Sequence, residues 1–257
     1  MEQMKPVCVI IGAGAGIGGT VGKTFAAEGY HSVLCRRSDA EGLDALVDAI
    51  KSEGNDATGL LFNAIEPDVL EDHLVSIEKD TGPIDVVVYN LGAQIGNRTL
   101  ADTPPKSFEM GWRLGTLGLY RTARTVFPFM EERGRGTLLV TSSTAAVRGN
   151  AGQHSHAAAM GGRRMLCQSL NAEFSSKGIH VAHIIIDGAV DAPDTLGKLL
   201  GPERFQKLRE TVGADDGLLL PEKIAETYLH IAQQHRSVWT HELDLRSYSD
   251  TAWWNHG

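Results

Sequence analysis

The sequence has few cysteines, few aromatic residues and no block of positive charge, and these shortages disfavour several classes of protein. Of its 257 residues three are cysteines, and Cys8, Cys35 and Cys167 lack the spacing of metal ligands. We therefore predict no metal site and three small, buried thiols. The net charge of −8, without a cluster of lysine and arginine, disfavours a nucleic-acid surface.

Long hydrophobic runs are also missing. The apolar stretch near the N-terminus ends at Gly12 and is too short for a signal-peptide core or a membrane span. We expect a soluble, cytoplasmic protein without a membrane partner. Hydrophobic residues make up 42% and charged residues 22% of the chain, which is typical of a globular protein rather than a disordered one.

Apolar, strand-like segments alternate with helix-like segments along the whole chain. Strands are expected at residues 7–11, 32–35, 57–62, 84–90, 136–142, 179–186 and 238–245. Helices are expected from about residue 17 and at 40–54, 67–79, 106–132, 153–177 and 221–235, with Pro128 kinking or ending the helix that contains it. This alternation predicts one α/β domain over residues 1–257, a Rossmann-type doubly wound fold with a mainly parallel seven-stranded sheet. Within it, the less regular stretch at about 190–220 is expected to shape a substrate pocket.

Glycine is in excess, and several of the 29 glycines follow the first expected strand directly. The segment "GAGAGIGG", residues 12–19, leads from that strand into the first helix. Gly12, Gly16 and Gly18 let the backbone turn tightly and approach a pyrophosphate, whose charge the helix N-terminal amides attract. A tight connection that binds nothing is the alternative, and the spacing and position of the glycines favour the binding site.

The second expected strand ends in Arg36 and Arg37. An acidic residue there would hydrogen-bond the adenosine ribose, whereas two guanidinium groups suit a 2′-phosphate. Solvated charge at a strand end is the alternative. We predict that the cofactor is NADP(H) rather than NAD(H).

These motifs resemble those of the short-chain dehydrogenase/reductase family, over essentially the whole chain. The glycine turn is similar to the family pattern G-x-x-x-G-x-G, and "VVVYNLGA" is similar to its N-N-A-G segment at Asn90 and Gly92. "DGAVDA" is similar to its P-G-x-x-x-T segment at Gly188 and Val190, and Asn63 takes the place of an adenine-contacting aspartate. The residues expected to bind the cofactor are then Gly12, Gly16, Ile17, Gly18, Arg36, Arg37, Asn63, Asn90, Gly92, Gly188 and Val190.

The resemblance also implies an active site in which the reacting groups have changed. In the family a serine on the fifth strand acts with a tyrosine on the next helix and a lysine one turn later. Ser143 matches the serine, while the tyrosine position holds His156 and the lysine position holds Met160. The position of the asparagine that completes the family's site holds Gly115.

An imidazole can transfer a proton without a lysine beside it. A phenol has a pKa near 10, which a neighbouring ammonium lowers, whereas the ordinary pKa of an imidazole is about 6.5. We predict an atypical NADP(H)-dependent oxidoreductase acting on a small carbonyl or alcohol, with His156 as acid/base and Ser143 orienting it or holding the substrate oxygen. Two alternatives remain: a non-redox lyase, isomerase or dehydratase, and a cofactor-binding protein without catalysis.

Several other residues have expected places. His183 is predicted to be buried and hydrogen-bonded, and His154 to lie in the pocket or on the surface. Arg148 is a candidate for contacting an anionic substrate, while Arg163 and Arg164 are expected on a solvated or subunit-facing surface. The two tryptophans of the tail "YSDTAWWNHG" cap the pocket or pack against a second subunit. The resemblance implies a homodimer or homotetramer.

Overall fold

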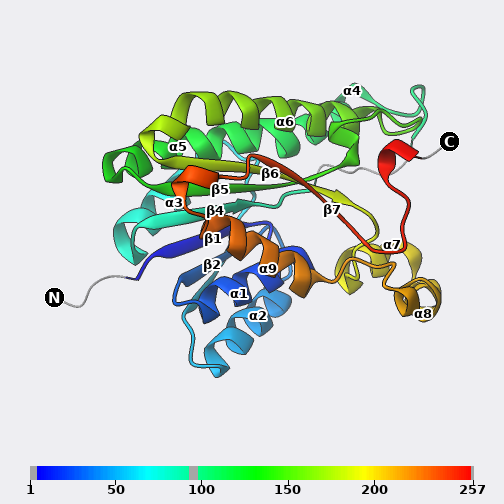
Figure 1. The fold of residues 1–257 in the computed structure, drawn as a ribbon, viewed down its shortest axis with the longest axis horizontal. Helices are drawn as coiled ribbons and strands as arrows, with labels where there is room; N and C mark the ends of the chain where they lie inside the picture. The colour runs from blue at the N-terminus through cyan, green and yellow to red at the C-terminus, as the bar shows by residue number, and fades with distance from the viewer. Residues whose placement is uncertain (1–4, 93–97, 256–257) are drawn as a thin grey trace.

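Seven parallel strands form one sheet at the centre of the computed structural model, which describes residues 5–92 and 98–255 (Figure 1). Their order is β3-β2-β1-β4-β5-β6-β7, and every pair of neighbours is parallel. The strands are β1 (Val7–Ile11), β2 (His31–Arg36), β3 (Ala57–Leu61), β4 (Ile84–Tyr89), β5 (Gly136–Ser143), β6 (Ile179–Asp187) and β7 (Glu242–Arg246). The predicted seven-stranded Rossmann-type sheet is confirmed, and it is wholly parallel.

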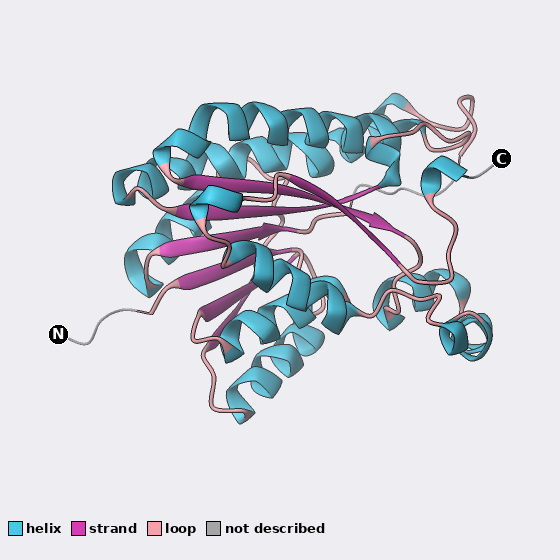
Figure 2. Cartoon of the chain, in the orientation of Figure 1, coloured by secondary structure: helices cyan, strands magenta, loops and turns pink. Residues whose placement is uncertain are grey.

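Helices cover both faces of this sheet (Figures 1 and 2). One layer contains α1 (Ile17–Ala27), α2 (Ala40–Ser52) and α9 (Pro221–Ala232). The other layer contains α3 (Val69–Ser76), α4 (Pro105–Trp112), α5 (Gly118–Arg133) and α6 (His154–Phe174). The short helices α7 (Lys198–Leu200) and α8 (Pro202–Thr211) follow β6, within the stretch predicted to be irregular. The fold is doubly wound, as the alternation of strands and helices predicts.

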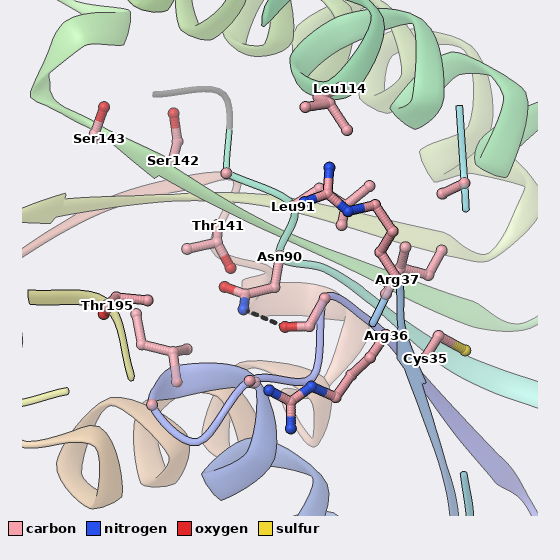
Figure 3. A pocket seen from close by; sticks show the side chains of 18 of the residues that line it. Cys35, Arg36, Arg37, Asn90, Leu91, Leu114, Thr141, Ser142, Ser143 and Thr195 are labelled. Carbon is pink, nitrogen blue, oxygen red and sulfur yellow. Dashed lines mark hydrogen bonds between the residues drawn. The ribbon is translucent and has the colours of Figure 1, made fainter. Parts of the chain in front are cut away.

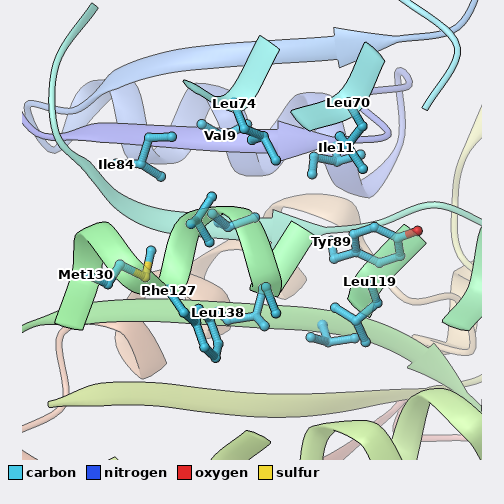
Figure 4. Close-up of a cluster of buried hydrophobic side chains, with 14 of the residues drawn as sticks. Val9, Ile11, Leu70, Leu74, Ile84, Tyr89, Leu119, Phe127, Met130 and Leu138 are labelled. Atoms are coloured by element: carbon cyan, nitrogen blue, oxygen red, sulfur yellow. The ribbon is translucent and has the colours of Figure 1, made fainter. Parts of the chain in front are cut away.

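The sheet divides the hydrophobic core in two, because neighbouring residues of a strand point to opposite faces. Val9 and Ile11 of β1 belong to the cluster that includes side chains of α3 and α5 (Figure 4). Cys8 and Ile10 belong to the cluster that includes α1 and α9. All three cysteines are buried free thiols, as predicted. Because helices cover both faces of the sheet, a binding site has to lie at its ends or edges. In open parallel sheets it lies at the carboxyl ends of the strands.

Several boundaries differ from the predictions, most clearly in the following elements. The helix expected at 106–132 consists of α4, a π-helical turn (Arg113–Leu117) and α5, and Pro128 does not end it. Pro128 lies on the exposed side of α5, so the carbonyl left free by its missing N–H faces solvent. The helix expected from residue 67 begins at Val69. β7 begins at Glu242, because a 3₁₀ turn (Arg236–Val238) precedes it.

The order of the strands reverses direction between β1 and β4. From β1 the chain proceeds outward to β2 and β3, and it then returns to the other side of β1 to form β4. In parallel sheets of this kind the connections diverge at such a point and leave a crevice at the carboxyl ends of the strands. Within the described ranges no helix is long and apolar enough to cross a membrane.

Candidate active site

A cavity of about 740 Å³ lies at the carboxyl ends of the central strands, where the strand order reverses. Its size is typical of a small-molecule or cofactor pocket. Ser143 and His156 line it, and Gly188 is the one predicted cofactor residue that is not part of its described lining. The predicted cofactor residues in the lining are Gly12, Gly16, Ile17, Gly18, Arg36, Arg37, Asn63, Asn90, Gly92 and Val190.

The charge of the cavity wall is opposite to that of the whole chain. Arg36, Arg37 and Arg163 line the cavity, and its described lining includes no aspartate or glutamate. The net charge of the chain is −8. A positive, concave wall in an acidic protein attracts an anionic ligand. The described residues hold no group of three or more His, Cys, Asp or Glu side chains arranged for a metal ion.

Several glycines of the turn are packed so closely that a larger residue would not fit at their positions. Gly12 has a φ of 101°, in the region that favours glycine. A Cβ atom on Gly18 would lie 2.3 Å from the Gly12 carbonyl oxygen, and one on Gly16 would lie 2.8 Å from Cβ of Ala192. Asn90 Nδ2 donates a hydrogen bond of 2.8 Å to the Gly12 carbonyl and so ties the end of β4 to the turn (Figure 3).

Arg36 and Arg37 leave the end of β2 in different directions (Figure 3). Arg36 Nη2 donates to Asp39 Oδ2 at 2.8 Å, whereas its Nη1 is buried and has no hydrogen-bond partner within residues 5–92 and 98–255. The side chain of Asp194 is a second, more distant ion-pair partner at 3.8 Å. Asn63 Nδ2 donates to Glu66 Oε1 at the end of β3. The wall at this end therefore offers a guanidinium group with an unused donor.

Ser143 and His156 come together across two elements. Ser143 ends β5 and His156 lies in the first turns of α6, and Ser143 Oγ is 3.0 Å from His156 Nε2. Burial and then the positive charge of Arg163 lower the pKa of His156. His156 Nδ1 is buried without a partner among the described residues. The pair has the geometry of a hydroxyl and a base that exchange a proton.

The prediction that Arg163 lies on a solvated or subunit-facing surface is wrong. Arg163 is 1% exposed and lines the cavity together with His156 and Met160. These three residues are four and then three positions apart, so they share one face of α6, and this face packs against the sheet. Ser142 Oγ lies 3.8 Å from Met160 Sδ, which packs Met160 against β5.

The remaining predicted residues lie outside this cavity. His183 is buried, and its Nδ1 is 3.0 Å from Glu242 Oε2, as predicted. Glu242 also accepts two hydrogen bonds from Arg164, which is half-buried. Arg148 is not in the cavity lining: its Nη1 donates to the Trp253 carbonyl at 2.8 Å. His154 is exposed.

The tryptophans of the tail line a second, smaller cavity beside β7. Trp253 Nε1 donates to Asp244 Oδ2 at 3.0 Å, and the rings of Trp253 and Trp254 meet edge to face. Both belong to the lining of a cavity of about 400 Å³ and not to that of the larger one. Of the two placements expected for them, capping of the larger pocket does not occur in this structure.

Several lining residues were missed by the sequence analysis. Met110 of α4 and Leu114 of the π-helical turn make one part of the wall apolar, and Thr195 contributes from the stretch after β6. No motif marks these three positions. Ala192, which also lines the cavity, is the last residue of the segment "DGAVDA". The place of Arg163 could have been predicted from helical spacing. A residue seven positions after His156 on the same helix lies on the same face as His156. Together the fold and the cavity define a dinucleotide-binding type of α/β protein.

Comparison with known proteins places the chain in a family. The short chain dehydrogenase family matches it over residues 6–197. The short-chain reductase protein NovJ of Streptomyces niveus is 29% identical over 93% of this chain and 92% of its own. The 7alpha-hydroxysteroid dehydrogenase of Escherichia coli K12 is 30% identical over 78% of this chain and 76% of its own. A short-chain dehydrogenase structure from Rhodopseudomonas palustris, 29% identical, has a TM-score of 0.78 and covers 95% of this chain and 99% of that chain. The protein belongs to the short-chain dehydrogenase family.

Proposed function

We propose that this protein is an NADP(H)-dependent oxidoreductase that interconverts a small carbonyl compound and its alcohol, with His156 as the acid/base. The observation that carries the proposal is the 3.0 Å contact between Ser143 Oγ and His156 Nε2 in the wall of the cavity. His156 takes the place of the family's tyrosine and Met160 that of its lysine. The match to relatives named as a reductase and a dehydrogenase supports the reaction class.

The residues of the larger cavity fit a nicotinamide dinucleotide phosphate. The tight glycine turn leaves room for a pyrophosphate, and the buried Nη1 of Arg36 lacks a partner that a phosphate oxygen would supply. Arg36 and Arg37 would hold the 2′-phosphate, and Asn63 would contact the adenine. The cofactor, when bound, supplies or accepts the hydride. The pyrophosphate would lie against Gly12, Gly16, Ile17 and Gly18, and the rest of the cofactor against Asn90, Gly92, Gly188 and Val190.

His156 moves the proton in this proposal. Burial and the charge of Arg163 lower its pKa, so the imidazole is neutral at neutral pH and accepts a proton from a substrate hydroxyl. To protonate a carbonyl oxygen, the imidazole must first be charged. Oxidation of an alcohol is therefore expected to speed up as the pH rises through the pKa of His156, and reduction of a carbonyl as the pH falls through it.

Ser143 and the apolar lining position the substrate. The Ser143 hydroxyl lies within hydrogen-bonding distance of the imidazole and can also hold the substrate oxygen. Met110 and Leu114 add apolar surface to the same cavity. A small substrate whose reacting oxygen is flanked by apolar groups suits the part of the cavity beside Ser143 and His156. The stretch at about 190–220 contributes Val190, Ala192 and Thr195 to the cavity, which supports its proposed role in shaping the substrate pocket.

The test is cofactor binding followed by turnover. Dissociation constants for NADPH and NADH are measured by nicotinamide fluorescence, and a panel of small ketones and secondary alcohols is then assayed with each cofactor. We expect NADPH to bind at least about tenfold more tightly, because an arginine–phosphate contact contributes more than about 1.4 kcal/mol. A preference for NADH would overturn the choice of cofactor. Turnover of a substrate by protein stripped of cofactor would overturn the redox assignment.

A further inference from the structure

Arg163 is a buried cation that has no counterion among the described residues. Among the residues that the structure describes it is the only lysine or arginine in the fully buried class, with 1% of its surface exposed. The ion pairs of the described chain include none with Arg163. Its neighbours Tyr89 and Cys167 are neutral, because burial raises the pKa of each. Burial of an unpaired guanidinium is costly, so its hydrogen bonds have to offset the lost hydration.

The guanidinium group donates to three backbone carbonyls from three different elements. Nε donates to Gly115 O at 2.8 Å, Nη2 donates to Leu91 O at 2.8 Å, and Nη1 donates to Thr141 O. Leu91 follows β4, and Thr141 lies two residues before Ser143 in β5. Gly115 lies in the π-helical turn beside the cavity residue Leu114. One side chain thus joins three of the elements that form the cavity wall.

We propose that Arg163 is a positioning residue of this active site. It fixes the backbone beneath Ser143 and His156, and it supplies the fixed positive charge on the face of α6 where Met160 supplies none. Its guanidinium lies in the cavity lining, on the helix face that also carries His156. Arg163 acts through the imidazole and through the strand that carries Ser143.

The other charged side chains of the elements beside the start of α6 are exposed to solvent. Lys106 and Glu109 of α4 and Arg113 of the π-helical turn are exposed, and Arg113 Nε donates to Glu109 Oε1 at 2.9 Å. The 3₁₀ turn after Ser143 has no titratable side chain, and His154 on α6 itself is exposed. Arg163 is the charged group that lowers the pKa of His156.

This inference deepens the proposed function, since it rests on His156 as the acid/base, but it can be tested without turnover. The full chain without cofactor is studied by NMR titration of its histidine side chains. His156 is assigned by the signal that disappears in His156→Gln. Arg163→Gln removes the charge, Arg163→Lys keeps it, and Arg164→Gln is the matched control, because it removes an equal charge that is bonded to Glu242.

The expected result is an upward shift of the His156 pKa toward its ordinary value in Arg163→Gln. Arg163→Lys and Arg164→Gln are expected to keep the wild-type value. An unshifted pKa in folded Arg163→Gln, or an equal shift in Arg164→Gln, overturns the proposal. If these shifts occur in a protein that reduces no carbonyl and oxidises no alcohol, then the proposed function fails, and what stands is the effect of the Arg163 charge on His156.

A second measurement needs only the wild type and variants that keep a cation at position 163. The Nε resonance of Arg163, assigned by its loss in Arg163→Lys, should shift with pH at the midpoint of the His156 titration. The shift should be absent in His156→Gln. An Arg163 resonance that does not respond to the titration of His156 overturns the proposal, even where Arg163→Gln does not fold.

Discussion

The two ends of the larger cavity are built in different ways. At one end, the ligand-facing groups come from short continuous segments, the glycine turn and the pair Arg36 and Arg37. At the other end, Ser143, His156 and Arg163 come from a strand and two separate turns of a helix. Figure 3 shows the serines of β5 on one side of the cavity and the two strand-end arginines on the other.

In the proposed function, this difference separates the groups that bind the cofactor from the groups that transfer the proton. The first end depends on local backbone geometry, so a change there should alter cofactor affinity. The second end depends on tertiary hydrogen bonds, such as the three that Arg163 donates to backbone carbonyls. A change there should alter turnover or the pKa of His156 while affinity for the cofactor is retained.

The largest effect is expected at the proton-transfer end. Replacement His156→Ala should lower turnover by about 10²- to 10⁴-fold, the usual contribution of a general acid or base. The dissociation constant for NADPH should change by less than about twofold, because the other end is intact. Consumption of NADPH with the ketone panel measures the first effect and nicotinamide fluorescence the second. The exposed His154→Ala is the control, and equal loss in both variants would contradict the assignment.

A smaller effect is expected in the glycine turn. Gly18→Ala places a Cβ atom 2.3 Å from the Gly12 carbonyl oxygen, so the backbone of the turn must move. NADPH binding should weaken by about tenfold or more, equivalent to about 1.4 kcal/mol. Gly149→Ala is the matched control, because Gly149 is exposed, is not part of the described cavity lining, and its Cβ would meet nothing within 4 Å. Equal affinities in the two variants would show that the turn does not hold the cofactor.

The choice between the two cofactors should depend on the guanidinium groups at the end of β2, and Arg36 tests this directly. Arg36→Gln removes the guanidinium group whose Nη1 lacks a hydrogen-bond partner among the described residues. The dissociation constant for NADPH should therefore rise about tenfold. The constant for NADH, which has no 2′-phosphate, should stay within about twofold. Parallel fluorescence titrations measure both. If the two constants rise together, Arg36 supports the fold of the turn and not the recognition of a phosphate.

The smallest effect concerns acid stability and lies outside both ends. Burial lowers the pKa of His183 to about 4, despite the neighbouring Glu242. The imidazole of His183 therefore binds a proton at a higher pH in the unfolded chain than in the folded one. The stability that the neutral His183 gives the folded state is complete above about pH 6.5 and decreases as the pH falls toward 4. Between about pH 7.5 and 5.5 the free energy of unfolding should fall by about 1 kcal/mol from this residue.

Urea unfolding of the wild type and of His183→Gln at a series of pH values measures this contribution. The curve for His183→Gln should be flatter over the same range. Parallel curves for the two proteins would contradict the assignment of acid sensitivity to His183. The same data show whether any acid limb of the pH–rate profile reflects unfolding rather than the titration of His156.

The fold was predictable because its determinants are local. Strands buried on both faces are apolar throughout, as in residues 7–11, and the alternation with helices leaves few topologies. The ends of elements were less predictable, because Pro128 is tolerated on the exposed side of α5. The start of β7 depends on its pairing with β6 rather than on its own residues.

The meeting of Ser143 and His156 was predictable from the resemblance to the family, which places the second residue thirteen positions after the first. The structure brings the two side chains within 3.0 Å. Arg163 was misplaced, because an arginine next to a second arginine in a helix rich in small residues suggests a solvated surface. Arg148 pairs with a carbonyl 105 residues further along the chain, a contact that no local pattern predicts.

In the proposed mechanism an imidazole, that of His156, accepts and donates the proton at the nicotinamide end of the cavity. A crystal structure of the protein soaked with NADPH is the sharpest test of this role. We expect an ordered nicotinamide ring with its C4 atom facing His156 and Ser143, and the 2′-phosphate against Arg36 and Arg37. A nicotinamide bound away from His156, or a cavity that stays empty at saturating NADPH, would contradict it.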